Sequence, residues 1–152
     1  MPIDEVLKRL PQLKKFRAGV PATDVDVASV ESTLAVRLPA DYVAFLRTFG
    51  FVRWFGHCVY GIVRPEVVQV PGYDYSMVTH TVHARAEAAR TGLETLPLEG
   101  VVIERYDAGG WYVLFTEGSG RSGTVALFDH EAGGVEVQGW PSLEAFLAFL
   151  GV

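Results

Sequence analysis

Short apolar segments alternate with glycine-rich connections through the last third of the sequence, and this alternation restricts the fold more than any other feature. The apolar segments, at residues 101–106, 111–117, 124–129 and 135–138, are rich in β-branched and aromatic residues, as strands are. Connections of four to six residues separate them. Connections this short join antiparallel neighbours, because a parallel crossover needs about a dozen residues or more. The sequence therefore predicts an antiparallel sheet here.

The first third of the sequence has the apolar spacing of helices. Residues 3–17 carry an apolar stripe that Pro11 interrupts, which predicts a kink or two short helices. Thr23 and Asp26 have the spacing of a capping box, so a helix is expected from there to about residue 36. A second buried stripe follows at positions i, i+3, i+4 and i+7: Tyr42, Phe45, Leu46 and Phe49.

The middle of the chain changes from strand character to helix character. Residues 51–55 and 59–63 are typical of strands, and residues 66–70 predict a further short one. Residues 75–90 return to helical spacing. The expected apolar side of this helix consists of Tyr75, Val78, Val82, Ala86 and Ala89. A last helix is expected after Ser142.

The order of these elements predicts an α+β fold. Because consecutive strands form hairpins, we expect a mainly antiparallel, twisted sheet of about five to six strands with helices packed on one side. The length of 152 residues suits a single domain over residues 1–152, in which residues 1–20 form an N-terminal helical arm. A hydrophobic content of 49% is ordinary for a globular protein and excludes disorder as a description of the whole chain.

The charge is unevenly distributed along the chain. Residues 1–20 hold five basic and two acidic residues, a net charge of +3, whereas residues 21–152 hold eight basic and sixteen acidic residues, a net charge of −8. Binding to nucleic acid needs clustered Lys and Arg, so the acidic body argues against nucleic acid as a partner. A basic protein would suit it better.

The sequence gives three indications of where the protein acts. A single cysteine, Cys58, excludes an internal disulfide and a multi-cysteine zinc site. No apolar run approaches the roughly 20 residues of a membrane span, so no membrane contact is expected. Residues 1–10 contain acids and lack the apolar core of a secretory signal. We expect a cytoplasmic protein that is a monomer or a weak dimer.

Two patterns resemble ligand sites without matching them. His80, His83 and Glu87 share one face of the predicted helix, and two imidazoles with a carboxylate can bind a metal. A metalloprotease helix spaces its histidines at i and i+4, which this segment does not, so a solvated polar face is favoured. Residues 118–123 are glycine-rich but lack the Gly-Lys-Ser/Thr ending of a phosphate loop, which favours a hairpin tip. No metal or cofactor is expected.

Two further patterns bear on catalysis. Cys58 would need a histidine within hydrogen-bonding reach to act as a nucleophile, and a buried, inert cysteine is favoured. Glu104 and Asp107 have the chemistry of a paired-carboxylate site, but nothing in the sequence supplies a pocket for them. The chain is therefore predicted not to be an enzyme.

Aromatic residues concentrate around the predicted strands. They are Trp54, Phe55, Tyr106, Trp111 and Tyr112. Alternation along residues 111–116 places large apolar groups on both faces of that strand. Core packing is the default interpretation, and a contact surface for another protein is the alternative.

A series of residues in the first half resembles the opening signature of the SUKH superfamily, the Smi/Knr type. The signature is a helical glutamate, then Leu-Pro-x-Asp-Tyr-x-x-Phe-Leu and Asn-Gly, and the matching residues here are Glu31, Leu38, Pro39, Asp41, Tyr42, Phe45, Leu46 and Gly50. Residues 125–129 and 142–147 resemble the late strand and final helix of the family, so the resemblance covers about residues 23–150. Phe49 stands where the family commonly has asparagine.

The resemblance implies an α+β fold without catalysis. Bacterial members of the superfamily are mostly immunity proteins that bind and neutralise a toxin, often a nuclease, and fungal members act in cell-wall regulation. The signature residues are interpreted as structural, since Tyr42, Phe45 and Leu46 also form the predicted buried stripe.

Two protein-binding functions and one enzymatic function follow as hypotheses. The first is an immunity protein that binds a cognate, basic, nuclease-type toxin, and the second is a regulatory or scaffolding module with an endogenous protein partner. The third is a metal-dependent enzyme that uses His80, His83 and Glu87. Residues predicted to contact a partner, chosen for their chemistry near the sheet and its turns, are Trp54, Glu104, Tyr106, Asp107, Trp111 and Glu117.

Overall fold

The computed structural model describes residues 1–67, 74–91, 96–107 and 109–152. Its α-helices are α1 (Ile3–Arg9), α2 (Asp24–Leu34), α3 (Ala40–Phe49), α4 (Met77–Thr91) and α5 (Leu143–Phe149), with 3₁₀ turns η1 (Leu10–Gln12) and η2 (His130–Ala132). Its strands are β1 (Arg17–Ala18), β2 (Val52–Trp54), β3 (His57–Val59), β4 (Gly100–Arg105), β5 (Gly110–Phe115), β6 (Val125–Asp129) and β7 (Val135–Trp140). The predicted α+β class is confirmed.

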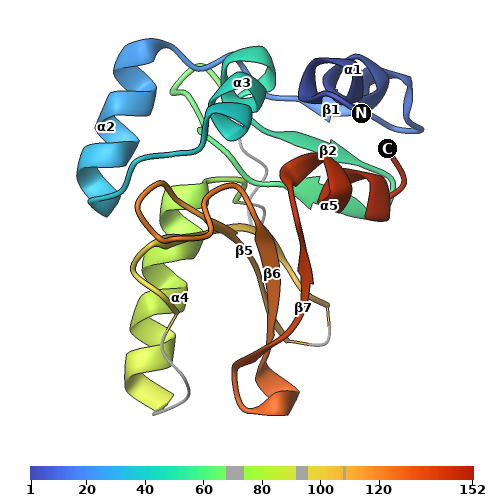
Figure 1. The fold of residues 1–152 in the computed structure, drawn as a ribbon. Coiled ribbons are helices and arrows are strands. Elements are labelled where there is room, and N and C mark those ends of the chain that lie inside the picture. Colours follow the sequence, from blue (N-terminus) through green and yellow to red (C-terminus); the bar gives the residue numbers. More distant parts are fainter. Residues whose placement is uncertain (68–73, 92–95, 108) are drawn as a thin grey trace.

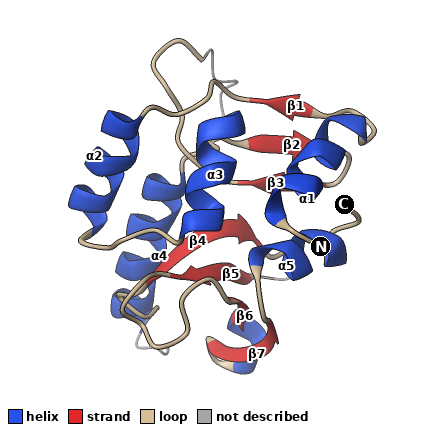
Figure 2. Ribbon diagram, turned by 45° about the horizontal axis from the view of Figure 1, so that its top comes forward, coloured by secondary structure: helices blue, strands red, loops and turns tan. Residues whose placement is uncertain are grey.

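The strands form two antiparallel sheets, and the expectation of one sheet of five to six strands is wrong. The first sheet has the order β1-β2-β3 and the second has the order β4-β5-β6-β7. Figure 2 shows the strands following one another in chain order across the molecule. The two sheets adjoin where Tyr60, just after β3, donates its backbone N–H to the Ile103 carbonyl at 2.7 Å.

The side chain of Glu104 lies at the break between the sheets. The register of β4 against β5 shifts between Val102 and Glu104. The backbone N–H of Cys58 in β3 points at the Glu104 carboxylate, 3.5 Å away, and not at a carbonyl of β4. The ladder therefore stops after one backbone bond, and a carboxylate occupies the junction.

The helices of the first third follow the predicted pattern. Thr23 and Asp26 form the capping box of α2: the Thr23 hydroxyl accepts from the Asp26 N–H at 3.2 Å, and the Asp26 carboxylate accepts from the Thr23 N–H at 2.8 Å. The predicted stripe of α3 is buried throughout. Pro11 lies in η1, directly after α1, so the chain turns there as expected.

Helix α4 exists as predicted, but its expected buried side is wrong. The buried residues are Met77, Thr81, Ala84 and Ala88, whereas Val82 is 51% exposed. Small side chains let α4 approach β4 closely, and the Thr81 hydroxyl accepts a hydrogen bond from the Val102 N–H at 2.9 Å. In the strand predicted at 66–70, residues 66 and 67 lie in a turn and a bend, and the rest falls outside the described residues.

Figure 1 shows α4 running alongside the four-stranded sheet, while α1 and α3 lie at the other end with the three-stranded sheet. The two termini lie close together. Ser142 is the N-cap of helix α5, and its hydroxyl accepts a hydrogen bond from the Ala145 N–H at 3.1 Å. Its Phe146 ring packs against Tyr112 and Trp140, with centroids 5.0 and 5.2 Å apart. This packing closes the core between the last helix and the sheet.

Candidate functional site

Two adjoining hollows lie at the junction of the two sheets, with volumes of about 560 and about 150 Å³. Residues shared by both linings are Gly56, His57, Glu104, Arg105 and Asp107. The larger hollow is completed by Arg53, Trp54, Cys58, Tyr60 and Tyr75. The smaller is completed by Tyr106, Tyr112, Phe149 and Leu150. We call the two together the junction hollow.

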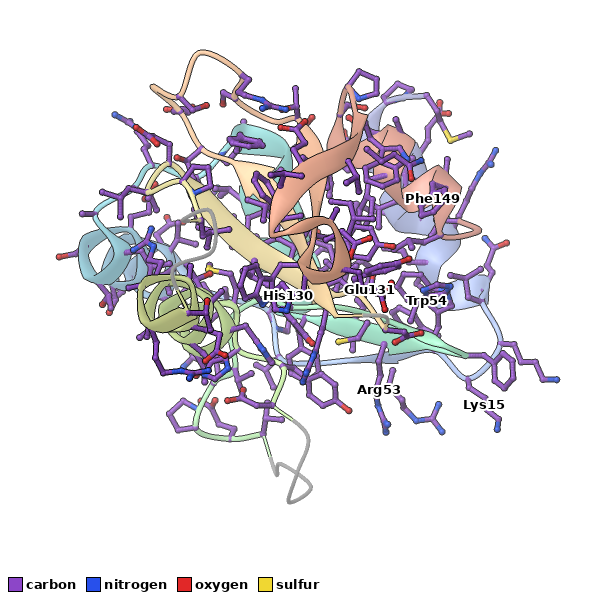
Figure 3. The ribbon with its side chains drawn as sticks, turned by 90° about the horizontal axis from the view of Figure 1, so that it is seen from below. Lys15, Arg53, Trp54, His130, Glu131 and Phe149 are labelled. Atoms are coloured by element: carbon purple, nitrogen blue, oxygen red, sulfur yellow. The ribbon has the colours of Figure 1, made fainter. Side chains whose placement is uncertain are left out.

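The β2–β3 hairpin positions one wall of the junction hollow. Its turn contains Gly56 at φ +84°, a conformation that favours glycine because a side chain would be strained there. Trp54 and His57 face each other across the hairpin register, with ring centroids 5.5 Å apart. Figure 3 shows Arg53 of the same hairpin extending away from the ribbon.

Glu104 forms the floor of the junction hollow. Its side chain is only 9% exposed. Oε1 lies 3.4 Å from His57 Nδ1 and 3.5 Å from the Cys58 backbone N–H. Oε2 is buried and has no hydrogen-bond partner among the described residues. Glu104 is therefore a buried acid with one oxygen satisfied by long contacts and one oxygen left over.

The protonation of Glu104 follows from this environment. Burial raises the pKa of Glu104 to about 8, and the negative charge of Asp107 acts in the same direction. The Cys58 N–H contact lowers the pKa and only partly offsets the burial. At neutral pH the carboxyl group is thus mostly protonated, and a cation placed beside it would favour its ionised form.

Cys58 has the environment of an inert thiol. Burial raises the pKa of the thiol well above its ordinary value, and the nearby Glu104 adds to this. A raised pKa leaves little thiolate at neutral pH, and the thiolate is the nucleophile. Among the described residues, no histidine ring nitrogen is hydrogen-bonded to the sulfur, so the structure does not assemble the Cys–His pair considered from the sequence.

The structure brings together four of the six residues predicted to contact a partner. Trp54, Glu104, Tyr106 and Asp107 all line the junction hollow, although they come from different sheets. Asp107 is exposed and Tyr106 half-buried, whereas Trp54 and Glu104 are buried. The four positions therefore lie around the same junction, with Asp107 and Tyr106 accessible and Trp54 and Glu104 buried beneath them.

The other two predicted residues lie apart from this junction. The Trp111 ring packs edge-on against His130 at 4.4 Å, and the residue is 7% exposed. Glu117 pairs with Arg37 at 3.3 Å and lines a separate hollow beside α2. Neither lines the junction hollow.

Sequence reasoning missed several residues of the junction hollow. Tyr60 follows β3, and its ring stacks on His80 with the ring centroids 3.9 Å apart. Tyr75 lies in the segment before α4, and its ring stacks on Phe51 with the centroids 4.8 Å apart. His57 carried a signal, since it stands three residues after Trp54 across a Phe-Gly turn. Such a spacing predicts a facing pair in a two-residue hairpin.

The metal hypothesis gains no support from the geometry. The described residues contain no group of three His, Cys, Asp or Glu side chains able to hold a metal ion. His80 Nε2 lies 2.7 Å from the Asp74 carbonyl, and Glu87 pairs with Arg90. The paired carboxyl groups Glu104 and Asp107 do share the junction hollow.

Comparison with known proteins identifies the family. Residues 24–147 match the model of the SUKH_6 family, described as SMI1-KNR4 cell-wall. The match covers most of the 152 residues, so the chain belongs to the SUKH superfamily. A search of curated proteins finds no match. The family is generally a non-catalytic immunity and regulatory family, and membership supports a role of one of these two kinds.

Among the described residues, no helix combines the length and the apolar character needed to cross a membrane.

Proposed function

We propose that this protein is a non-catalytic immunity protein that neutralises a cognate toxin by direct binding. The toxin docks on the face that contains the junction hollow, and the bound immunity protein blocks the toxin's active site or substrate groove. The encounter takes place in the cytoplasm and needs no cofactor.

One observation carries this proposal. In a member of a family of immunity and regulatory proteins, four residues chosen from the sequence as contacts line the two adjoining parts of the junction hollow: Trp54, Glu104, Tyr106 and Asp107. The hollow combines aromatic walls with a buried acid and an exposed one. Aromatic anchors surrounded by polar groups are typical of the centre of a protein interface. The net charge of −8 over residues 21–152 favours a basic toxin.

Co-expression tests the proposal. The toxin domains encoded next to this gene are expressed one at a time in a sensitive bacterial host, with and without the protein. We expect one toxin to arrest growth and this protein to restore it. Failure to protect against any of these toxins would overturn the proposal.

The description of the matched family favours a second candidate, a regulatory module of the SMI1-KNR4 cell-wall type. Such a module would bind an endogenous protein through the same face. Affinity capture from the unchallenged native cell separates the two functions. A stoichiometric housekeeping partner, together with no protection in co-expression, would favour regulation over immunity.

A further inference from the structure

Glu104 is the one described carboxylate with a buried oxygen that accepts no hydrogen bond. A buried polar group without a partner is costly, and natural proteins keep such groups mostly at functional positions. Glu104 also lines both parts of the junction hollow. Oε2 itself is closed to solvent, so a bound partner can supply the missing hydrogen bond only through a side chain that enters the hollow lined by Glu104.

We infer that the junction hollow receives a single arginine side chain of the protein partner, whose guanidinium donates to Oε2 of Glu104. This inference rests on the proposed binding function and names the chemistry of the contact. The partner's arginine enters between the aromatic walls and ends against the carboxylate.

The environment of Glu104 favours a cation over a neutral donor. Hydrogen bonds between ionised groups are about twice as strong as neutral ones, and a site shielded from water strengthens them further. Asp107 adds a second carboxylate at the exposed edge of the hollow. Among the described residues, the one basic side chain in ion-pairing range of Glu104 is His57, at 3.4 Å.

The walls favour arginine over lysine. The aromatic residues that line the hollow are Trp54, Tyr60, Tyr75, Tyr106 and Tyr112. A guanidinium is planar and weakly hydrated, so it stacks on aromatic rings more readily than an ammonium does. The protein's own Arg53 already does this, with its guanidinium 6.0 Å from the centre of the Tyr75 ring.

Two cations of the chain itself face the entering arginine. Arg53 and Arg105 line the hollow, and among the described residues neither forms an ion pair with Glu104. Both are exposed, so solvent screens their repulsion more than it screens the contact at the floor. Removing the Arg53 charge should therefore strengthen binding of a cation.

The contact has a measurable consequence for the proton on Glu104. Because Glu104 is mostly protonated at neutral pH and a guanidinium favours the ionised form, binding should release a proton. A purely structural Glu104 would release none.

The test uses the purified full-length protein and two small probes, acetyl-Gly-Arg-Gly-amide and its citrulline counterpart, which has the same shape but no charge. The ¹³C resonance of the Glu104 carboxyl group is followed by NMR at pH 7 as each probe is added. We expect the arginine probe to bind at least about tenfold more tightly than the citrulline probe, with an ionisation shift of this resonance.

Matched variants locate the contact. Glu104→Gln should abolish the preference for arginine, whereas Glu99→Gln, an exposed acid before β4, should retain it. Arg53→Gln should tighten binding about twofold or more. Equal binding of arginine and citrulline probes by the unmodified protein would overturn the inference, even if Glu104→Gln failed to fold. A lysine probe that bound as tightly as the arginine probe would overturn the assignment to arginine.

Failure of this inference and failure of the proposed function give different results. Protection in co-expression without any arginine preference would overturn the inference and leave the immunity function standing. An arginine preference without protection in co-expression would overturn the immunity function, and the assignment of an arginine-binding hollow would stand.

Discussion

The hydroxyl of Tyr42 in α3 donates a buried hydrogen bond of 2.7 Å to the backbone carbonyl of Tyr60. Tyr42 belongs to the family signature, and Tyr60 lines the junction hollow. The signature therefore bears on the candidate site through the backbone, because α3 fixes the segment from which the Tyr60 ring projects. Signature residues that contact no partner can still set the shape of the surface that does.

Removing this bond should destabilise the fold. Tyr42→Phe leaves the Tyr60 carbonyl buried without its only described partner, so the free energy of unfolding should fall by about 1–3 kcal/mol. Urea denaturation measures the change. Tyr75→Phe is the matched control, because the Tyr75 hydroxyl makes no hydrogen bond among the described residues. Equal effects of the two substitutions would contradict the account.

A glutamate on α2 holds the Leu-Pro corner that leads into α3. The Glu31 carboxylate accepts a hydrogen bond from the Leu38 N–H at 2.8 Å. Glu31→Ala should lower the free energy of unfolding by about 1–2 kcal/mol, since the amide is half-buried and loses its acceptor. Thermal unfolding checks this, with Glu99→Ala as the exposed control. An unchanged melting temperature for Glu31→Ala would show that the contact is dispensable.

Thr81 anchors the irregular part of β4 from which Glu104 projects. Its hydroxyl accepts from the Val102 N–H at 2.9 Å, next to the register shift between Val102 and Glu104. Thr81→Val keeps the volume but removes the acceptor, so a loss of about 1–3 kcal/mol in the free energy of unfolding is expected. Thr79→Val, at an exposed position of the same helix, should cost far less. Hydrogen exchange of the Val102 amide should accelerate only in the Thr81 variant.

Stability should depend on pH through Glu104. The pKa of Glu104 is raised from an ordinary 4.5 to about 8, so between these values the folded state binds a proton that the unfolded state has lost. This contribution to stability is complete below pH 4.5 and is lost as the pH rises through 8. Glu104→Gln mimics the protonated form and should not share the loss.

Denaturation of both proteins at pH 5, 7 and 9 tests this. The unfolding free energy of Glu104→Gln relative to the unmodified protein should rise with pH, by up to the order of 4 kcal/mol. Glu99→Gln, a change at an exposed acid, is measured beside it as the matched control. A difference for Glu104→Gln that stays constant with pH would contradict the protonation of Glu104 derived from its burial.

Local patterns were sufficient to predict most of the elements. The capping box at Thr23, the stripe of Tyr42 and Phe45 and the glycine-rich connections of the last third each fix backbone geometry over a few residues. The failures arose where tertiary packing decides. The side of α4 that is buried depends on how closely Ala84 and Thr81 let it approach β4, which helical spacing does not report.

The candidate site shows the same division. Trp54, Glu104, Tyr106 and Asp107 were predicted for their chemistry, and chemistry is visible in a sequence. The sequence could not predict that these residues converge, because their convergence depends on the contact between the Glu104 side chain and the Cys58 amide where the two sheets adjoin. Trp111 has equally suitable chemistry but packs against His130. Strand alternation could not separate these two outcomes, since both faces of β5 are buried.

Protection in co-expression, measured for two charge-reversal variants, shows which face of the protein binds the toxin. Asp107→Lys changes an exposed acid at the junction hollow, and Glu117→Lys changes an exposed acid in a separate hollow. We expect Asp107→Lys to lose protection against the cognate toxin and Glu117→Lys to retain it, with both proteins folded by circular dichroism. Retained protection by Asp107→Lys together with loss by Glu117→Lys would contradict the assignment of the binding face.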